Sequence, residues 1–170
     1  MKKEIPITGY EITLNDHPSM LNIGLSIFVA GCNFRCKNCH NKDSWDAKSG
    51  TMTSLLEIKK IIKEKSILIK YVAFLGGEPT LYNDEIVELA EYSKKKNLKT
   101  VLYTGEKAGN LSFLMIKAMN VIVDGKYEDE LKTDSFPSSS NQCVYFENHK
   151  LSEEEILNLP VNKNKMEEKC

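Results

Sequence analysis

Residues 23–41 read IGLSIFVAGCNFRCKNCHN, and this stretch decides the fold. Its first part, residues 23–30, is a short apolar run of the kind that forms a strand buried on both faces. Gly31 permits a turn after that strand. Cysteines then follow in the spacing C-x3-C-x2-C, at Cys32, Cys36 and Cys39. The stretch therefore predicts a buried strand with a thiol-rich loop at its carboxyl end.

Outside this stretch, short apolar runs alternate with segments of helical period. The further predicted strands are residues 69–75, 100–104 and 119–123, and the predicted helices start after Ser54, at about Asp84 and at residue 110. This βαβαβαβ order predicts a parallel sheet with right-handed crossovers. With 170 residues, the chain is shorter than the roughly 200–250 residues of a closed eight-stranded barrel. We therefore expect an α/β fold, a single-domain partial (open) parallel β/α barrel.

The alternating pattern weakens towards the C-terminus. Residues 143–146 have the composition of a strand, residues 151–159 predict a surface helix, and the residues from Pro160 onward predict a solvated tail. We therefore divide the chain into a main domain, residues 1–150, and a C-terminal helix and tail extension, residues 151–170.

The composition is that of a globular protein, with 41% hydrophobic and 28% charged residues. The formal net charge is −1 and Arg35 is the only arginine, so no overall field favours nucleic acid or an anionic membrane. No apolar run approaches the roughly 18 residues of a membrane-spanning helix, and Glu4 and Pro6 interrupt any signal-peptide pattern. We expect a cytoplasmic protein with no nucleic-acid or membrane partner. In that compartment five cysteines, an odd number, favour a metal site or catalytic thiols over disulfides.

The cysteine loop carries the clearest chemical signal. Thiolates are soft ligands that suit iron–sulfur clusters, zinc or copper(I), and a [4Fe–4S] cluster usually takes four protein ligands. Three thiols in one loop would leave one iron open to an exchangeable ligand, so the spacing favours an open cluster. Two alternatives remain: a zinc ion with a fourth ligand from His40, His17 or Cys143, or thiols that hold no metal.

A second motif, Gly76-Gly77-Glu78-Pro79, ends the second predicted strand at the same edge of the sheet. Glycine lets backbone carbonyls approach a ligand closely, and Glu78 would supply negative potential for an ammonium group. The alternative is a strand-ending turn with a solvated glutamate. Because ligands of such sheets bind outside the carboxyl ends of the strands, the coincidence of the two motifs favours ligand binding.

Together these motifs resemble those of the radical S-adenosylmethionine (SAM) superfamily. Segments 39–46 (CHNKDSWD), 102–106 (LYTGE), 121–131 (VIVDGKYEDEL) and 139–142 (SSNQ) resemble, more narrowly, the activating proteins of anaerobic ribonucleotide reductases. The resemblance implies a radical SAM activase that cleaves SAM reductively at a [4Fe–4S] cluster. It would then abstract hydrogen from a glycine of the large reductase subunit, with a low-potential electron donor as a further partner. The alternatives are an activase of another glycyl-radical enzyme and a non-catalytic, zinc-stabilised binding module.

The resemblance also assigns roles to residues. The implied cluster ligands are Cys32, Cys36 and Cys39. The implied cofactor-binding residues are Asn38 and His40 beside the third cysteine, Gly76, Gly77 and Glu78 around the SAM amino group, and Asp124. For Asp124 the resemblance implies a contact with SAM or with the partner protein. The alternative is a structural role, in which its side chain caps the turn before Gly125.

Two segments depart from the family pattern. Residues 14–20, LNDHPSM, lack the family's Asn-Gly-Pro-Gly and the arginine that follows it, and residues 136–138, FPS, replace Trp-Arg-Gly. Both departures affect the expected docking of the protein partner more than the expected cluster or the cleavage of SAM. Outside the motifs, we expect Cys143 to be a small buried residue and His17 to be solvated, and Cys170 has no assigned role.

Overall fold

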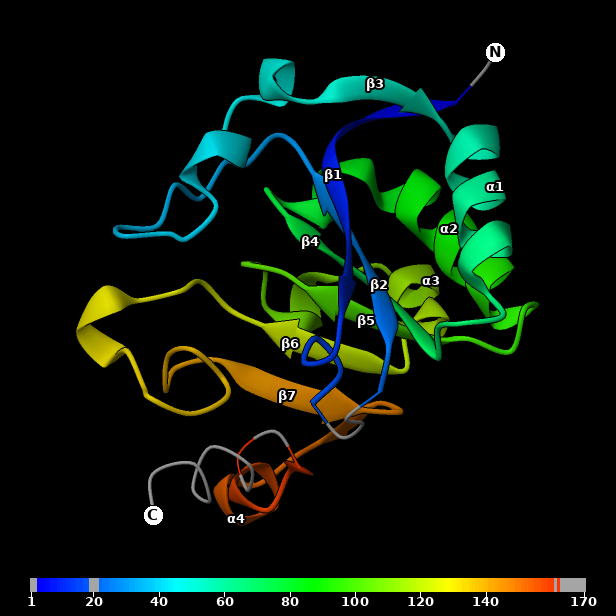
Figure 1. Ribbon diagram of the computed structural model, residues 1–170. Coiled ribbons are helices and arrows are strands. Elements are labelled where there is room, and N and C mark those ends of the chain that lie inside the picture. Colours follow the sequence, from blue (N-terminus) through cyan, green and yellow to red (C-terminus); the bar gives the residue numbers. More distant parts are fainter. Residues whose placement is uncertain (1–2, 19–21, 161, 163–170) are drawn as a thin grey trace.

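An eight-stranded sheet organises the protein, with the strand order β3-β1-β2-β4-β5-β6-β7-β8 (Figure 1). The computed structural model describes residues 3–18, 22–160 and 162. The strands are β1 (Glu4–Thr13), β2 (Gly24–Val29), β3 (Thr51–Ser54), β4 (Tyr71–Gly76), β5 (Lys99–Tyr103), β6 (Val121–Asp124), β7 (Cys143–Phe146) and β8 (His149–Lys150). Cys170 and most of the predicted tail lie outside the described residues.

The centre of the sheet is parallel, as the sequence predicts. Strands β2, β4, β5 and β6 pair in parallel, and each is joined to the next by a crossover connection. The prediction of an open α/β sheet is therefore confirmed. Because parallel strands share one direction, the cysteine loop after β2 and the glycine pair at the end of β4 lie at the same edge.

Antiparallel strands extend this parallel centre on both sides. Strand β1 pairs with β2 and β3, and β7 pairs with β6 and β8. Strand β1 is not among the predicted strands, because Pro6 and Gly9 interrupt its apolar pattern. The sheet accommodates that interruption through a shift in the pairing register between Ile7 and Gly9.

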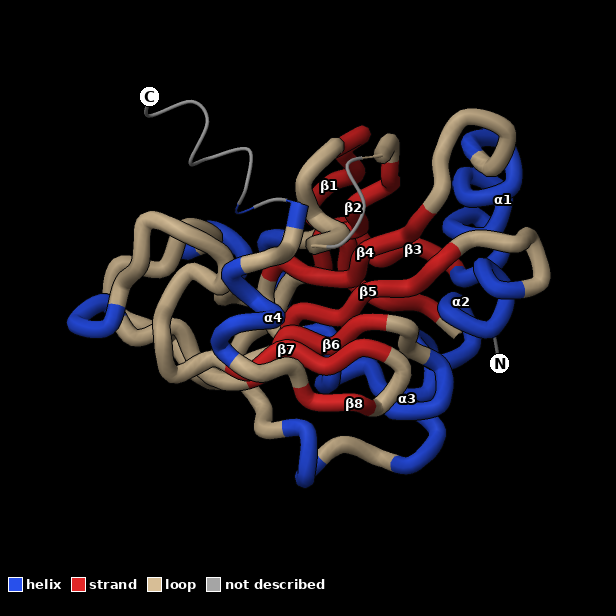
Figure 2. The backbone as a smooth tube through the Cα atoms, turned by 90° about the horizontal axis from the view of Figure 1, so that it is seen from below, coloured by secondary structure: helices blue, strands red, loops and turns tan. Residues whose placement is uncertain are grey.

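The main helices are α1 (Leu55–Lys65), α2 (Asn83–Lys94) and α3 (Phe113–Ala118), and they cover one face of the sheet (Figures 1 and 2). Helix α1 begins where predicted, since the Ser54 hydroxyl accepts a hydrogen bond from the Glu57 amide at 3.3 Å. The main core lies between these helices and the sheet, where Ile62, Phe74 and Leu89 are all fully buried. Burial of each such side chain contributes about 1.5–3 kcal/mol.

The other face of the sheet carries a smaller core. Ala73, Val101 and Val123 belong to it, together with the fully buried Tyr71. Leu151 and Ile156 of the C-terminal segment pack against this core, and Ile156 lies in helix α4 (Glu153–Leu157). The C-terminal segment therefore closes part of the open face, near β6 and β7.

Three expectations about burial are wrong. Cys143, at the start of β7, is half-buried rather than buried. His17 is 3% exposed rather than solvated, because its ring packs between Tyr71 and Phe146, at 5.5 and 6.0 Å between ring centroids. Asn162 is 2% exposed, so the part of the predicted tail that the structure describes is not wholly solvated. Within the described residues, no helix combines the length and the apolar character needed to cross a bilayer.

Candidate active site

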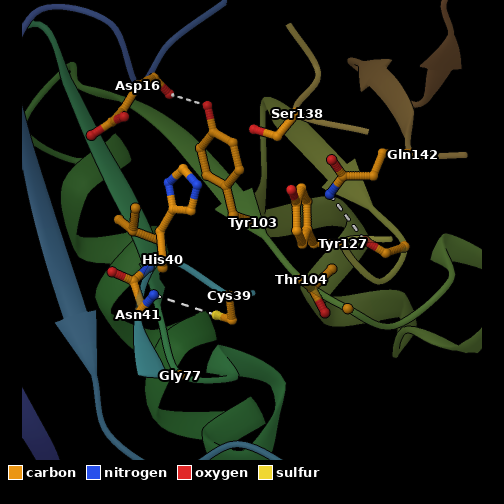
Figure 3. Close-up of a pocket in the computed structure, with 14 residues that line it drawn as sticks. Asp16, Cys39, His40, Asn41, Gly77, Tyr103, Thr104, Tyr127, Ser138 and Gln142 are labelled. Carbon is orange, nitrogen blue, oxygen red and sulfur yellow. Dashed lines mark hydrogen bonds between the residues drawn. The ribbon is translucent and has the colours of Figure 1, made fainter. Parts of the chain in front are cut away.

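A pocket of about 350 Å³ lies at the carboxyl edge of the parallel strands (Figure 3). Its walls come from the cysteine loop, from the ends of β4 and β5, and from the segments that follow β6. The lining residues include Cys39, His40, Gly76, Gly77, Tyr103, Thr104, Tyr127, Ser138 and Gln142. Asp16, from the connection between β1 and β2, also reaches the pocket. Both sequence motifs therefore meet at this cavity.

Backbone hydrogen bonds hold the start of the cysteine loop. The Gly31 amide donates to the Ser44 carbonyl at 2.8 Å, and the Cys32 amide donates to the Trp45 carbonyl at 3.0 Å. Gly31 has a φ of +92°, a conformation that glycine adopts without strain. The loop therefore leaves β2 through a sharp turn and is fixed to residues 44 and 45.

The three thiols of the loop are free and half-buried. Burial raises the pKa of the Cys36 thiol, and a hydrogen bond from the Tyr127 backbone partly offsets this shift. The negative charges of Cys39 and Cys32 raise it further. Among the described residues, no three His, Cys, Asp or Glu side chains converge on a single metal ion.

This donor set fits an iron–sulfur cluster. Three thiolates around one zinc ion would each lie about 2.3 Å from the metal, and a zinc site also needs a fourth ligand. Two of the three candidate fourth ligands lie away from the loop, since His17 packs against Phe146 and Cys143 lies on β7. The third, His40, lines the pocket beside Cys39, and joint coordination of one tetrahedral ion by two adjacent residues would be strained. Three soft ligands on one short loop match three corners of a [4Fe–4S] cluster and leave the fourth iron open.

The glycine pair packs directly on the base of the cysteine loop. The Gly77 amide donates to the Val29 carbonyl at 2.8 Å, and the Glu78 amide donates to the Gly31 carbonyl at 2.7 Å. A Cβ atom on Gly77 would lie 2.2 Å from the Gly31 oxygen, and one on Gly76 would lie 2.7 Å from the Val29 oxygen. Both positions need glycine because two backbone segments are in contact there.

The Glu78 carboxylate lies behind the pocket wall and is 1% exposed. Its Oε1 accepts hydrogen bonds from the Thr80 amide, the Thr80 hydroxyl and the Thr104 hydroxyl at 3.0, 2.8 and 2.7 Å. Its Oε2 accepts one from the Gly105 amide at 2.8 Å. Glu78 therefore joins the ends of β4 and β5, and its influence on a ligand in the pocket is through its negative potential.

The other predicted cofactor-binding residues, His40, Asn38 and Asp124, differ in whether they line the pocket and in how exposed they are. His40 lines the pocket, with its ring centroid 6.2 Å from that of Tyr127. Asn38 is exposed and donates its side-chain amide to the Asp129 carboxylate at 2.7 Å. Asp124 is 1% exposed and lies outside the pocket lining, although the next residue, Gly125, is part of it.

Several groups from neighbouring elements contact the Asp124 carboxylate. It accepts hydrogen bonds from the Ala108 amide at 2.7 Å and the Cys143 amide at 3.3 Å, and it lies 3.7 Å from the Lys107 ammonium. These contacts join the turn after β5 to the start of β7. The side chain therefore organises the loops around the pocket.

Several pocket residues were not selected by the sequence analysis. Three hydrogen bonds within the described part of the chain hold Asp16. Its carboxylate accepts one from the Ser26 hydroxyl, and its backbone amide donates one to the Tyr71 hydroxyl at 3.1 Å. Its backbone carbonyl accepts the third from the Tyr103 hydroxyl at 3.1 Å (Figure 3). It belongs to the segment that departs from the family pattern, so no local signal marks it. Tyr127 and Gln142 do lie in quoted segments, 121–131 and 139–142, which could have indicated them.

Comparisons with known proteins identify the family of the chain. Residues 23–145 match the family described as a 4Fe-4S single cluster domain. The chain is 33% identical over 127 residues to an anaerobic ribonucleoside-triphosphate reductase-activating protein of Enterobacteria phage T4, covering 70% of this chain and 81% of that protein. It is 28% identical over 109 residues to a pyruvate formate-lyase-activating enzyme of Clostridium pasteurianum, covering 61% of this chain and 46% of that protein.

A solved structure supports the fold. The crystal structure of QueE from Escherichia coli superposes with a TM-score of 0.54 at 16% sequence identity, covering 71% of this chain and 70% of that one. The family match spans both pocket motifs, and the sequence likeness to the phage protein extends over most of both chains. The chain therefore belongs to the family of anaerobic ribonucleoside-triphosphate reductase-activating proteins, radical SAM enzymes that carry a [4Fe–4S] cluster and use S-adenosylmethionine.

Proposed function

We propose that this chain activates the large subunit of an anaerobic ribonucleotide reductase by abstracting hydrogen from a glycine Cα, which leaves a stored glycyl radical. The observation that carries the proposal is the packing of the glycine pair on the base of the cysteine loop, where the Glu78 amide donates to the Gly31 carbonyl at 2.7 Å. This contact fixes the cysteine loop and the glycine pair as two walls of one pocket. The relatives named for the same activity support the choice of reductase.

The residues of the chain would bind and orient the cofactors. Cys32, Cys36 and Cys39 would hold three irons of the cluster. When bound, the reduced cluster supplies the electron that cleaves SAM to methionine and a 5′-deoxyadenosyl radical. The backbone of Gly76 and Gly77 would receive the SAM amino group, close to the negative potential of Glu78.

The remaining predicted residues would act around the reactive part of the ligand. His40 forms one wall of the pocket, opposite Tyr127, and both rings would exclude water from the radical. Asn38 would act through the cysteine loop, which its contact with Asp129 ties to the segment after β6. Asp124 would act in the same way, by holding the loops that carry Ala108 and Cys143.

The partners follow from the chemistry. A partial barrel leaves one side open, which suits a substrate that is a segment of another protein. The reaction consumes one electron for each SAM that is cleaved, so we propose a low-potential electron-transfer protein as the donor. We place the enzyme in the cytoplasm, because its free thiols suit a reducing compartment, and the net charge of −1 favours neither nucleic acid nor membrane.

The first test is anaerobic SAM cleavage. The protein is reconstituted with iron and sulfide and reduced, SAM is added, and 5′-deoxyadenosine is measured for the wild type, Cys36→Ala and Cys143→Ala. Cys143 is a matched control because it is also free and half-buried but lies on β7 outside the loop. Product from the wild type and Cys143→Ala, and none from Cys36→Ala, would support radical SAM chemistry. Bound zinc with no visible cluster would instead support a structural role for the loop.

The second test identifies the protein substrate. The reduced, SAM-loaded protein is mixed with the large reductase subunit, and the glycyl radical is measured by electron paramagnetic resonance. The similarity to a pyruvate formate-lyase-activating enzyme favours one alternative, activation of another glycyl-radical enzyme. A radical on that class of enzyme, with none on the reductase, would select the alternative.

A further inference from the structure

The described C-terminal segment contacts the pocket loop through one buried amide side chain. Asn162 accepts a hydrogen bond from the Phe136 amide at 2.7 Å and donates to the Phe136 carbonyl at 3.0 Å. It also donates to the Ile156 carbonyl, beside helix α4, at 2.7 Å. The residue is 2% exposed. The Asn162 side chain thus pairs with both the N–H and the C=O of the Phe136 backbone. A neighbouring β-strand would form the same pair of hydrogen bonds.

Phe136 begins the loop that forms the outer wall of the pocket. Ser138, two residues later, lines the pocket, and its carbonyl accepts a hydrogen bond from the Thr133 amide at 3.0 Å. Gln142 also lines the pocket and donates to the Gly125 carbonyl at 3.0 Å (Figure 3). The middle of the loop pairs with residues 131–133, where the Ser140 amide donates to the Leu131 carbonyl at 2.9 Å. Gln142 holds its far end, and Asn162 holds its first residue, Phe136.

The segment that carries Asn162 lies beyond the family match, which ends at residue 145. The loop that it holds begins with residues 136–138, which differ from the family's Trp-Arg-Gly. Apolar packing already joins the two parts, since Phe136, Leu151 and Ile156 contact the same inner core. Apolar contact alone does not fix a backbone position, whereas the two hydrogen bonds between Asn162 and the Phe136 backbone do, and a third anchors Asn162 to Ile156.

We propose that Asn162 is a positioning residue for the SAM pocket: the C-terminal extension holds Phe136 and thereby places Ser138 and the outer wall against the ligand. The inference deepens the proposed function and rests on it. Its physical basis is that the loop has to be ordered before it can contact a ligand. A loop that is ordered in advance reduces the entropy lost on binding.

The test compares Asn162→Ala and Asn162→Asp with Asn158→Ala, all in cluster-loaded protein. Asn158 is a matched control because it is an exposed asparagine of the same segment, and its side chain contacts only the Glu154 carbonyl. Asn162→Asp keeps the acceptor for the Phe136 amide but loses both donated hydrogen bonds, so it gives a second variant should Asn162→Ala fold poorly. Thermal melts establish that each variant is folded.

Two quantities are measured: hydrogen exchange of the Phe136 amide, and the Kd for S-adenosylhomocysteine by calorimetry. For Asn162→Ala we expect faster exchange at Phe136 and a Kd raised about fivefold to tenfold, the effect of roughly one hydrogen bond. The KM for SAM should rise in parallel while kcat at saturating SAM stays close to the wild-type value, and Asn158→Ala should match the wild type in every measurement.

The outcomes separate the positioning role from the proposed function. Faster exchange with an unchanged Kd would show that Asn162 stabilises the loop without serving the ligand, and would overturn the positioning role alone. An unchanged exchange rate would overturn it as well. A wild-type protein that binds no S-adenosylhomocysteine would overturn the proposed function and, with it, the inference.

Discussion

The Thr104 hydroxyl donates a hydrogen bond to the buried Glu78 carboxylate at 2.7 Å and accepts one from the Glu106 amide at 3.0 Å. Through this pair of residues, the glycine motif after β4 is tied to the turn after β5. Both elements line the pocket, so the contact sets their separation. Glu78 thus has a structural task in addition to any electrostatic effect on a ligand.

Glu78→Gln should destabilise the protein and weaken ligand binding. An amide has one oxygen, so it cannot accept hydrogen bonds on both sides, and its nitrogen would face the Gly105 amide or the Thr104 hydroxyl. We expect a loss of about 1–3 kcal/mol in the free energy of unfolding, measured in urea, because a buried donor is left without an acceptor. Glu91→Gln, an exposed glutamate of α2, is the control. Equal stability for the two variants would contradict the structural task.

Gly77→Ala should disrupt the joint between the two motifs. The new methyl group would lie 2.2 Å from the Gly31 carbonyl and 3.0 Å from the Ser44 carbonyl, and rigid backbone on both sides leaves it no room. We expect a stability loss of about 1–3 kcal/mol, together with loss of S-adenosylhomocysteine binding in calorimetry. Gly109→Ala is the matched control, because a Cβ there meets no atom within 4 Å. If both variants bind equally, the contact is not needed for the pocket.

Stability should fall on acidification because of His17. Burial lowers the pKa of His17 from 6.5 to about 4, with the charge of Lys99 as a second cause. Between these two values the unfolded chain binds the proton and the folded chain does not, so the free energy of unfolding rises with pH across this window. The contribution is fully present above about pH 6.5 and is lost as the pH falls towards 4.

The corresponding measurement is urea unfolding at pH 7 and pH 5 of the wild type and His17→Gln. We expect the wild type to lose about 2 kcal/mol more than the variant between these pH values, since one pKa unit corresponds to about 1.4 kcal/mol. His149→Gln, a change at an exposed histidine, should retain the wild-type dependence. An identical loss in the wild type and His17→Gln would assign the acid sensitivity to other groups.

Asp129→Ala should loosen the cysteine loop. The Asp129 carboxylate accepts hydrogen bonds from Asn38 at 2.7 Å and from the Tyr127 hydroxyl at 3.0 Å, so it joins the loop to the segment after β6. We expect a chelator to remove iron several times faster from the variant. Glu130→Ala should behave as the wild type, because the Lys37–Glu130 ion pair is 69% exposed on both sides and contributes little. Iron release at the wild-type rate from both variants would mean that the loop holds the cluster without this contact.

The local sequence was sufficient for the parallel centre of the fold. Apolar runs mark β2, β4, β5 and β6, and helix signals such as Ser54 mark the crossovers between them. It was not sufficient for β1, whose pairing with β2 and β3 compensates for Pro6 and Gly9. It also failed for His17, because a single polar residue in a loop shows no periodicity that would indicate burial.

By itself, the sequence determined which residues could hold a cluster and which edge of the sheet would carry it. Thiol spacing, glycines and strand order are local properties that can be read along the chain. Only the tertiary structure decided that Glu78 joins two strand ends, that Asp16 reaches the pocket and that Asn162 holds Phe136. Each of these contacts joins residues far apart in the chain, and their partners are selected by the burial of polar groups that must find hydrogen bonds once water is excluded.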